Sequence, residues 1–582
     1  MENKIVPIKW IMGKANQEEN IYEFSKFAKD ISTLGIDESI ARVLYNRDIN
    51  TYDKVNKHLF MTLSDAYDPN LFKDSEKFIE GLKRVIDEKH KVVIMGDYDV
   101  DGVTGTSIAM LALRNLGIDV DFYMNNRFEE GYGFKPESLE AILRLYPDVK
   151  TIITVDNGIV SFEAVELAVN KGIQVIVTDH HETKADGTLP CAFAVVNHKR
   201  KDCDYPFKHL SGAGVIFKML TLLYFELEQD MQYMYDMLDI LAVSTVADIV
   251  SLTDENRVYV KEGLRLLRED HRLFFSILNE IMDIKTIDEE TIGFKYSPAI
   301  NAIGRLDGCP AEIVRAIISD DEEFVREVCT KMVSRNEDRK EYTSKQVEQA
   351  EVMLLEETDR DAFVLHNEEF KEGIVGLIAG KICERYHTPV IALTTHHGLI
   401  KGSARSTSLI DIKDGLDYCA DLLEGYGGHA QAAGLSLKPE NLIAFKKRLN
   451  EYVRKEMEGK EETKTVLIDA SLEPSQINGD TVDLINKLRP YGQDFPKPIF
   501  GYRTKVMEFD RNIKGNVLKI VGFNNIAVLG FDNKKQYMDL GEPNGIAVLG
   551  CPSINVFGHR VSYQFMIKEN NLKAQTYVQK TV

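Results

Sequence analysis

Several features that would assign this chain of 582 residues to a special class are scarce or absent. No run approaches the roughly 18 to 20 consecutive apolar residues of a membrane span, and residues 1–10 lack the apolar core of a secretory signal. The 16 prolines are too few for a collagenous or proline-rich chain. We therefore expect a compact, cytoplasmic protein that makes no use of a membrane.

Paired cysteines are also missing. The seven cysteines include no C-x-x-C pair. The odd number argues against a closed disulfide framework, and the missing pair argues against a structural zinc site. We predict reduced thiols, most of them buried.

Positive charge is in short supply, with a net charge of -21. This balance is unfavourable for a nucleic-acid-binding protein, because phosphate contacts come from Lys and Arg. From Val466 onward, however, 14 Lys and Arg residues outnumber 11 Asp and Glu residues. Such a tail fits a separate binding module, although an ordinary fluctuation of charge gives a similar excess.

The apolar pattern is that of several domains, which the length also requires. Short apolar strands at 92–95, 151–155 and 174–177 are each followed by a polar turn, and the first two by a helical pattern. Nearly continuous apolar strands that alternate with helices predict a parallel sheet covered on both faces. The segment at 310–356 reads as helical and ends in a densely charged stretch.

The two ends of the chain differ from this central pattern. Residues 1–75 are mostly helical in pattern. A second, smaller α/β pattern occupies about 361–452. Beyond Val466, short strands separated by Asn, Asp, Gly and Pro turns predict a small β-barrel or sandwich.

Three carboxylates, Asp97, Asp99 and Asp101, follow the strand at 92–95. Placed together, they raise each other's pKa unless a cation compensates their charge. The alternative is a plain polar turn. A calcium loop of the EF-hand type is disfavoured, because its twelfth position is Ile108 instead of Glu.

Acidic and imidazole groups also follow the next two strands. Asp156 comes after 151–155, and the triplet Asp179-His180-His181 comes after 174–177. The ligand crevice of an open parallel sheet lies beyond the carboxyl ends of its strands, so these groups should meet there. Carboxylates and imidazoles without thiolates favour Mn²⁺ or Mg²⁺ over zinc. Lone histidines are more often structural, but an adjacent pair after an aspartate is unusual.

These motifs resemble the DHH phosphoesterase superfamily, named for the triplet at 179–181, and within it the RecJ exonucleases. The remaining motifs that carry the resemblance are Arg127 with 130–133, 155–158, 211–214, 245–248, 304–306, 335–336, 373–376, 402–406 and 427–429. They run in family order over about residues 90–435. The chain departs from the family at Asn197-His198, where Asn-Pro is usual.

The resemblance implies a 5′-to-3′ exonuclease of DNA repair and recombination. It would hydrolyse single-stranded DNA to 5′-mononucleotides with two Mn²⁺ or Mg²⁺ ions. The implied metal ligands are Asp97, Asp99, Asp101, Asp156, His180 and Asp248, with His181 beside them as a further catalytic residue. The implied substrate-binding residues are Arg127, Arg305, Ser403, Arg405 and His429. Without the resemblance, the loops at 402–406 and 427–429 would be interpreted as tight turns.

The implied domains are a helical segment at 1–75, a parallel-sheet DHH domain at 76–330, a connecting helix at 331–360, a smaller α/β DHH-associated domain at 361–455 and an OB-fold barrel at 462–582. An OB-fold binds single strands through basic grooves and aromatic stacking. A helicase or a single-strand-binding protein is a candidate partner beside the DNA itself.

Three alternatives remain. A DHH-family phosphodiesterase for short oligonucleotides or cyclic dinucleotides would keep the same metals without the long helix and the β tail. A family II pyrophosphatase would end far earlier. A replication scaffold built on a DHH fold would usually have lost metal ligands. Discrimination between DNA and RNA depends on a few contacts around the sugar, so both polymers remain open.

Overall fold

The computed structural model describes residues 8–574 apart from 270–271, 358–359, 397, 461–462 and 558–559. The described chain forms two compact units. The first comprises Tyr67–Val250 and Tyr259–Thr463, and the second comprises Ile8–Ala66, Ser251–Val258 and the chain from Lys464 onward. Within the described ranges, no helix combines the length and the apolar character needed to cross a membrane.

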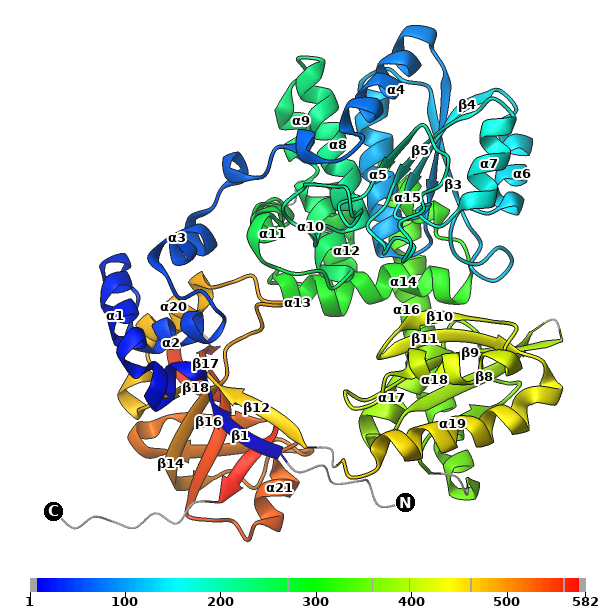
Figure 1. Ribbon diagram of the computed structural model, residues 1–582. Helices are drawn as coiled ribbons and strands as arrows, with labels where there is room; N and C mark the ends of the chain where they lie inside the picture. Colours follow the sequence, from blue (N-terminus) through cyan, green and yellow to red (C-terminus); the bar gives the residue numbers. More distant parts are fainter. Residues whose placement is uncertain are drawn as a thin grey trace. The chain divides into compact units, whose positions relative to one another are not determined.

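A five-stranded parallel sheet forms the centre of the first unit (Figure 1). Its order is β3-β2-β4-β5-β6, and every neighbouring pair is parallel. The strands are β2 (Lys91–Gly96), β3 (Val120–Met124), β4 (Val149–Val155), β5 (Gln174–Thr178) and β6 (Ala194–Val196). The sequence-based prediction of a covered parallel sheet is confirmed, because the apolar runs are buried on both faces.

Helices cover both faces of this sheet. Figure 1 shows α6 and α7 on one side and α5 and α8 on the other. The helices of this region are α4 (Ser75–Glu88), α5 (Val100–Asn115), α6 (Pro136–Leu145), α7 (Phe162–Asn170), α8 (Gly212–Glu226), α9 (Met231–Tyr235), α10 (Leu238–Ala247), α11 (Asp254–Arg268), α12 (Leu273–Ile281), α13 (Glu289–Thr291), the π-helix η6 (Ile292–Tyr296), α14 (Ser297–Leu306) and α15 (Ala311–Ile317).

A long helix, α16 (Glu322–Glu356), leads to a second sheet of the same unit. This sheet has the order β10-β11-β9-β8-β7; β7 and β8 are parallel and the other pairs are antiparallel. Its strands are β7 (Phe363–His366), β8 (Val390–His396), β9 (Leu399–Arg405), β10 (Gly425–His429) and β11 (Ala432–Leu437), and its helices are α17 (Val375–Tyr386), α18 (Ile412–Tyr418) and α19 (Leu442–Met457). The smaller α/β domain and the long helix were both predicted.

The second unit contains a closed barrel, which is one of the two folds that the strand pattern predicted and the one that the family resemblance implied. Neighbouring strands run β14-β15-β16-β18-β17, and β17 pairs back with β14. These strands are β14 (Phe500–Phe509), β15 (Leu518–Gly522), β16 (Ala527–Gly530), β17 (Gly545–Phe557) and β18 (Arg560–Ala574), with β13 (Ala470–Leu472), α20 (Gly479–Lys487) and α21 (Lys534–Asp539) beside them.

Residues near the start of the chain complete the barrel unit. α1 (Ile21–Ile31), α2 (Glu38–Asn46) and α3 (Tyr52–Phe60) contribute apolar side chains to the same core as the barrel strands. β1 (Ile8–Met12) pairs in parallel with β12 (Lys464–Ile468). The helical character was predicted, but the strand pairing was not, since β1 is short and its partner lies hundreds of residues away.

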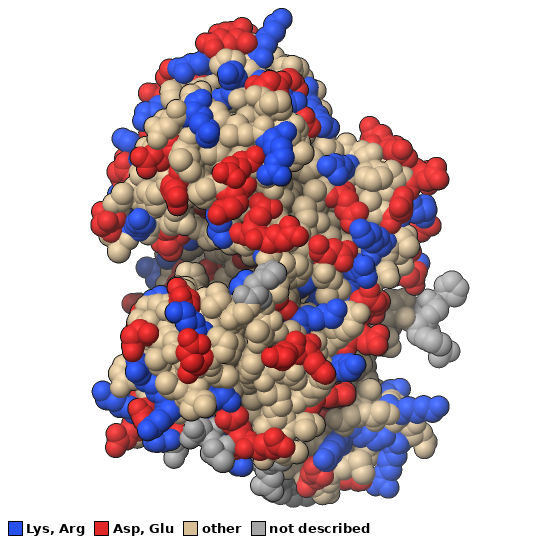
Figure 2. Space-filling view, turned by 90° about the vertical axis from the view of Figure 1, so that its right-hand side faces the viewer, with Lys and Arg blue, Asp and Glu red and all other residues tan. Residues whose placement is uncertain are grey.

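The surface charge is mixed on the face drawn in Figure 2. Acidic and basic side chains are interspersed there, so the net charge of -21 does not form one continuous negative face in that view. Five of the seven free cysteines are buried, while Cys191 is exposed and Cys309 is partly buried. The prediction of mostly buried thiols is confirmed.

Candidate metal centre and phosphate pocket

The turn between β2 and α5 carries the first three candidate ligands. Asp99 caps α5, because its Oδ1 accepts hydrogen bonds from the N–H groups of Asp101 at 2.9 Å and Gly102 at 3.2 Å. A Cβ atom at Gly102 would lie 2.3 Å from the carbonyl oxygen of Asp97. The glycine therefore lets the turn fold back closely enough to bring Asp97 and Asp99 together.

Asp101 is held by the start of another helix. Its carboxylate accepts hydrogen bonds from the backbone N–H groups of Gly212 at 2.6 Å and Ala213 at 2.9 Å, and from the hydroxyl of Ser244. Free N–H groups and the helix dipole favour a negative charge at this end of α8. The motif at 211–214 thus fixes the position of Asp101.

Asp156 occupies a strained turn at the carboxyl end of β4. Its φ of 63° is in the left-handed region, which residues with a side chain rarely adopt. A Cβ atom at Gly212 would lie 2.5 Å from the Cβ of Asp156. The glycine is therefore required for the close approach of α8, and the strain marks a position of functional interest.

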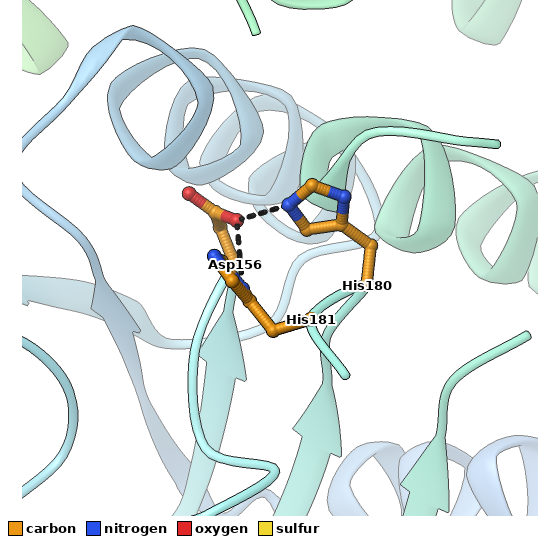
Figure 3. Close-up of side chains that lie close together, drawn as sticks. All are labelled: Asp156, His180 and His181. Atoms are coloured by element: carbon orange, nitrogen blue, oxygen red, sulfur yellow. Dashed lines mark ion pairs between the residues drawn. The ribbon is translucent and has the colours of Figure 1, made fainter. Parts of the chain in front are cut away.

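The imidazole of His180 lies at the centre of the carboxylates. Its Nε2 atom is 3.1 Å from Asp156 Oδ1 and 3.7 Å from both Asp101 Oδ2 and Asp248 Oδ2. Figure 3 shows the rings of His180 and His181 directed toward Asp156, and His181 Nδ1 is 3.8 Å from Asp156 Oδ1. Three sheet strands and the end of α10 thus deliver groups to one place.

Burial and mutual repulsion keep these carboxylates from ionising freely. Burial and the charge of Asp99 raise the pKa of Asp97 well above its usual range, and burial with the neighbouring aspartates does the same for Asp156. Burial and the charges of Asp101 and Asp99 raise the pKa of Asp248 to about 9. The site therefore favours the binding of positive charge.

The two histidines differ in charge. Burial lowers the pKa of His180 against the attraction of Asp101, so this ring is neutral and able to bind a metal. Burial would also lower the pKa of His181, but the hydrogen bond and charge of Asp179 raise it to about 9. The distance from His181 Nδ1 to Asp179 Oδ1 is 2.8 Å.

Asp179 supports the site instead of joining the ligand groups. Its oxygens accept hydrogen bonds from the N–H groups of Ile159, His180 and His181. Tyr132 adds a further contact: its hydroxyl lies 3.1 Å from His181 Nδ1 and donates to the carbonyl oxygen of Asp156 at 3.3 Å. Neither role was predicted from the sequence.

The arrangement fits divalent cations. Within the described part of the chain, neither Asp97 Oδ1 nor Asp156 Oδ1 accepts a hydrogen bond of acceptable geometry, although both atoms are buried. A buried polar atom without a partner is unfavourable, and a metal ion would satisfy both. The structure brings together all seven residues predicted for the catalytic centre. They form three overlapping groups, and within each group the ligand atoms lie within 4.8 Å of one another. The seven residues are Asp97, Asp99, Asp101, Asp156, His180, His181 and Asp248. Oxygen and imidazole ligands suit Mn²⁺ or Mg²⁺.

A cavity of about 800 Å³ contains most of the predicted substrate-binding residues. Its lining includes Arg127, Arg305, Ser403 and Arg405. His429 is not among the lining residues: it is exposed on β10, opposite Ala432, which in turn pairs with Arg405. The structure therefore gathers four of the five and places the fifth on the same sheet.

The cavity is strongly electropositive. Burial and the nearby charges of Arg127, Arg339 and Arg405 lower the pKa of Arg305 to about 10. The guanidinium of Arg405 is oriented by a hydrogen bond that its Nη1 donates to Ser403 Oγ at 2.7 Å. The repulsion between crowded guanidinium groups is reduced when they bind a phosphate, to which each can donate two parallel hydrogen bonds. Arg339 was not predicted, since one arginine in a charged helix carries no signal.

The glycine motif at 373–376 permits two close approaches beside the cavity. A Cβ atom at Gly373 would lie 2.0 Å from the carbonyl oxygen of Arg305. A Cβ atom at Gly376 would lie 3.1 Å from a guanidinium nitrogen of Arg405. The motif therefore leaves room for both arginines.

Tyrosines connect the cavity to the metal centre. Tyr132, which contacts His181, also lines the cavity, as does Tyr98. The guanidinium of Arg127 lies 5.0 Å from the ring centre of Tyr98. The electropositive cavity and the acidic cluster are therefore neighbouring parts of one site.

Three family models match successive parts of the chain. The N-terminal domain of the DHH family matches residues 91–245, the DHHA1 domain matches 333–455, and the RecJ OB domain matches 468–569. Together with the candidate metal centre, these matches define a DHH phosphoesterase that carries an OB domain.

Comparison with individual proteins narrows this class. The single-stranded-DNA-specific exonuclease RecJ of Bacillus subtilis is 33% identical over 547 residues, which cover 92% of this chain and 68% of that protein. The Escherichia coli RecJ is 34% identical over 456 residues, covering 74% of this chain and 78% of that protein. The chain belongs to the RecJ family of single-stranded-DNA-specific exonucleases, as its motifs indicated.

Solved structures agree with the predicted fold class. The crystal structure of Thermus thermophilus RecJ in complex with Mn²⁺ has a TM-score of 0.81 at 24% identity, covering 98% of this chain and 80% of that one. The crystal structure of an exonuclease RecJ bound to manganese has a TM-score of 0.58 at 30% identity, covering 66% of this chain and 95% of that one.

Proposed function

We propose that this protein degrades single-stranded DNA from the 5′ end and releases 5′-mononucleotides, with two Mn²⁺ or Mg²⁺ ions bound at the acidic cluster. The observation that carries this proposal is the position of a buried cluster of unsatisfied carboxylates next to an arginine-lined cavity. In this proposal the cluster binds the scissile phosphate and the neighbouring cavity binds the terminal phosphate.

The residues that would hold the ions are Asp97, Asp99, Asp101, Asp156, His180 and Asp248, and Asp156 would contribute to both. When bound, such ions lower the pKa of water to near neutrality and neutralise charge on the phosphoryl oxygens. Asp156 belongs to two of the three ligand groups, one with His180 and His181 and one with Asp97 and Asp99. This shared membership supports a contribution of Asp156 to both ions.

The cavity residues bind and orient the substrate. Arg305 and Arg405 supply guanidinium forks for the terminal phosphate, and Ser403 orients Arg405. The imidazole of His181 is held beside the ligand groups by its hydrogen bond with Asp179 and by the hydroxyl of Tyr132.

The architecture favours a polymer over a short substrate. A phosphodiesterase for short oligonucleotides would need the same site, but it would need neither the long helix α16 nor a β-barrel unit. An OB domain typically binds single strands through stacking and basic grooves. A scaffold without activity is disfavoured because every predicted ligand position still carries Asp or His.

The proposed role is in DNA repair and recombination, where single strands must be supplied. A helicase that opens duplex DNA or a single-strand-binding protein that covers the product strand is the partner we propose.

The test is a Mn²⁺-dependent time course on 5′-phosphorylated single-stranded DNA labelled at either end. Duplex DNA, single-stranded RNA and a dinucleotide serve as parallel substrates. Early release of labelled mononucleotide from the 5′ end supports the proposal. Turnover of the dinucleotide alone would instead identify a phosphodiesterase for short oligonucleotides.

A further inference from the structure

An exposed aromatic residue lies on an unusual helical segment close to the metal centre. Phe294 is 80% exposed on η6, the π-helical turn between α13 and α14. π-helical turns are rare and are frequent at functional sites. A large apolar side chain on such a turn lacks the burial that would explain it structurally.

The turn packs against the end of α10, which carries Asp248. A Cβ atom at Gly293, the residue before Phe294, would lie 3.9 Å from Val246 Cγ1, two residues before Asp248. Ile249, directly after Asp248, is exposed with a φ of 57°, which is strained for a β-branched residue. η6 therefore borders the region of the proposed ligand Asp248.

The same helical face continues to the phosphate cavity. Phe294, Pro298, Asn301 and Arg305 are separated by four, three and four residues, which places them on one side of a helix. These four are exposed or partly exposed, while most residues between them are buried. Arg305 lines the cavity and donates to the carbonyl oxygen of Gly373 at 3.4 Å. In Figure 1, α13 and α14 form one rod below α10.

The length of this face suits a single strand. Eleven residues separate Phe294 from Arg305, which corresponds to about 16 Å at 1.5 Å per residue. That distance spans about five nucleotides at the stacked spacing of 3.4 Å, and fewer when the strand is extended. A terminal nucleotide at Arg305 therefore leaves the following nucleotides within reach of Phe294.

We propose that the strand on the 3′ side of the scissile bond follows the face of η6 and α14, and that Phe294 stacks against one of its bases. This inference rests on the proposed exonuclease function. The occupant is the substrate's own strand, because the face is continuous with the cavity that binds its end. Stacking on an aromatic side chain is tolerant of sequence, which suits an enzyme that degrades any single strand.

The experiment compares a 5′-phosphorylated 12-mer with a 5′-phosphorylated dinucleotide, which is too short to reach Phe294. We expect Phe294→Ala and Phe294→Leu each to raise the ratio of KM for the 12-mer to KM for the dinucleotide by about tenfold. Phe294→Tyr retains a ring and should keep the wild-type ratio. Loss with Leu and retention with Tyr would distinguish stacking from simple apolar contact.

Phe225→Ala is the matched control. Phe225 is 69% exposed near the end of α8 opposite to the end that holds Asp101, and this variant should leave both KM values unchanged. An unchanged ratio in Phe294→Ala, or an equal rise of both KM values, would overturn the proposed path. Failure of the exonuclease proposal itself is distinguishable, since the wild-type protein would then release no mononucleotide from the 12-mer.

Discussion

Asp156 in the first unit and Asp469 in the second are both only 2% exposed, yet their surroundings are opposite. Asp469 accepts hydrogen bonds from Arg47 Nη1 at 2.6 Å, from Arg47 Nη2 at 3.1 Å and from the N–H group of Ile499 at 2.9 Å. Asp156 Oδ1 receives no hydrogen bond of acceptable geometry from any described residue, and the charges of four other aspartates raise the pKa of Asp156 further after burial has raised it.

The difference separates a structural charge from a functional one. A buried carboxylate with a complete set of donors ties segments together, as Asp469 does between α2 and the chain near β14. A buried carboxylate without donors destabilises the protein unless something binds to it. The cluster around Asp156 therefore favours the binding of cations. Substitution of Asp156 should lower activity without lowering stability, whereas substitution of Asp469 should lower stability.

The largest expected effect is on activity in Asp156→Asn. Loss of an outer-shell partner of a metal typically lowers activity 10- to 100-fold, so loss of a direct ligand should lower the hydrolysis rate more than about 100-fold. The temperature of unfolding without metal should stay constant or rise, because one repelling charge is gone. Hydrolysis rates at saturating Mn²⁺ and thermal unfolding measure the two effects.

Binding of single-stranded DNA serves as the control for Asp156→Asn. Because the arginine cavity and the barrel unit are unchanged, anisotropy of a labelled strand should report nearly unaltered affinity. A variant with near-normal hydrolysis would remove Asp156 from the metal site.

The second effect is on stability in Asp469→Asn. Removing one partner of a buried ion pair leaves Arg47 uncompensated, and we expect a loss of about 3 to 5 kcal/mol in the unfolding free energy of the barrel unit. Chemical denaturation followed by the single tryptophan, Trp10, which lies in this unit, measures it.

A double variant sharpens this prediction. Arg47→Met combined with Asp469→Asn removes both charges and keeps a side-chain oxygen that can accept from the N–H group of Ile499, so most of the lost stability should return. If Asp469→Asn alone unfolds like the wild type, the contrast between the two aspartates fails.

The third effect concerns pH and metal. Raised carboxyl pKa values, about 9 for Asp248, mean that ion binding displaces protons. Apparent Mn²⁺ affinity should therefore rise with pH, by about tenfold per pH unit for each proton released. Without metal, the folded state holds more protons than the unfolded state above the ordinary carboxyl range, so stability should fall as pH rises toward 9.

Calorimetry in buffers with different ionisation enthalpies counts the released protons. Asp156→Asn is the control, and it should release fewer. An affinity for Mn²⁺ that does not change between pH 6 and pH 8 would contradict the raised pKa values.

Much of this contrast is visible in the sequence. The apolar runs in the sequence show where each strand ends and a turn begins. The sequence alone therefore places Asp97, Asp156 and His180 at the carboxyl edge of the sheet. The barrel follows from short strands and their turns. These features depend on local patterns, which a single sequence contains.

Other features depend on approaches between distant segments. The charge of Arg339 acts on Arg305 only because α16 packs beside α14, and Arg47 meets Asp469 only in the folded barrel unit. Asp179 belongs to the motif that names the superfamily, but its hydrogen bonds to backbone N–H groups make it a support. Residue type and spacing cannot distinguish a ligand from the residue that orients it.

His198 provides the smallest effect and the sharpest test of the comparison. It stands where the family usually has proline, it is fully buried, and neither ring nitrogen makes a hydrogen bond of good geometry to a described residue, the backbone of Lys208 being a weak partner only. Unlike Asp156, it is outside the candidate metal groups. Its ring lies edge to face with the ring of Phe72, and the two ring centres are 6.3 Å apart. A poorly satisfied polar group at this position should therefore be replaceable by an apolar ring.

We expect His198→Phe to change stability by less than about 1 kcal/mol at pH 8, since the lost nitrogens make no hydrogen bond of good geometry to a described residue. Burial lowers the pKa of His198 well below 6.5, so below that pH only the unfolded chain takes up the proton. Wild-type stability should then decline by up to about 1.4 kcal/mol per pH unit more than that of the variant. Thermal unfolding of both proteins between pH 8 and pH 5 measures this difference. If the stabilities of both proteins changed with pH in parallel, His198 would have a partner in the folded protein. The lack of a hydrogen-bond partner would then no longer identify Asp156 as a functional residue.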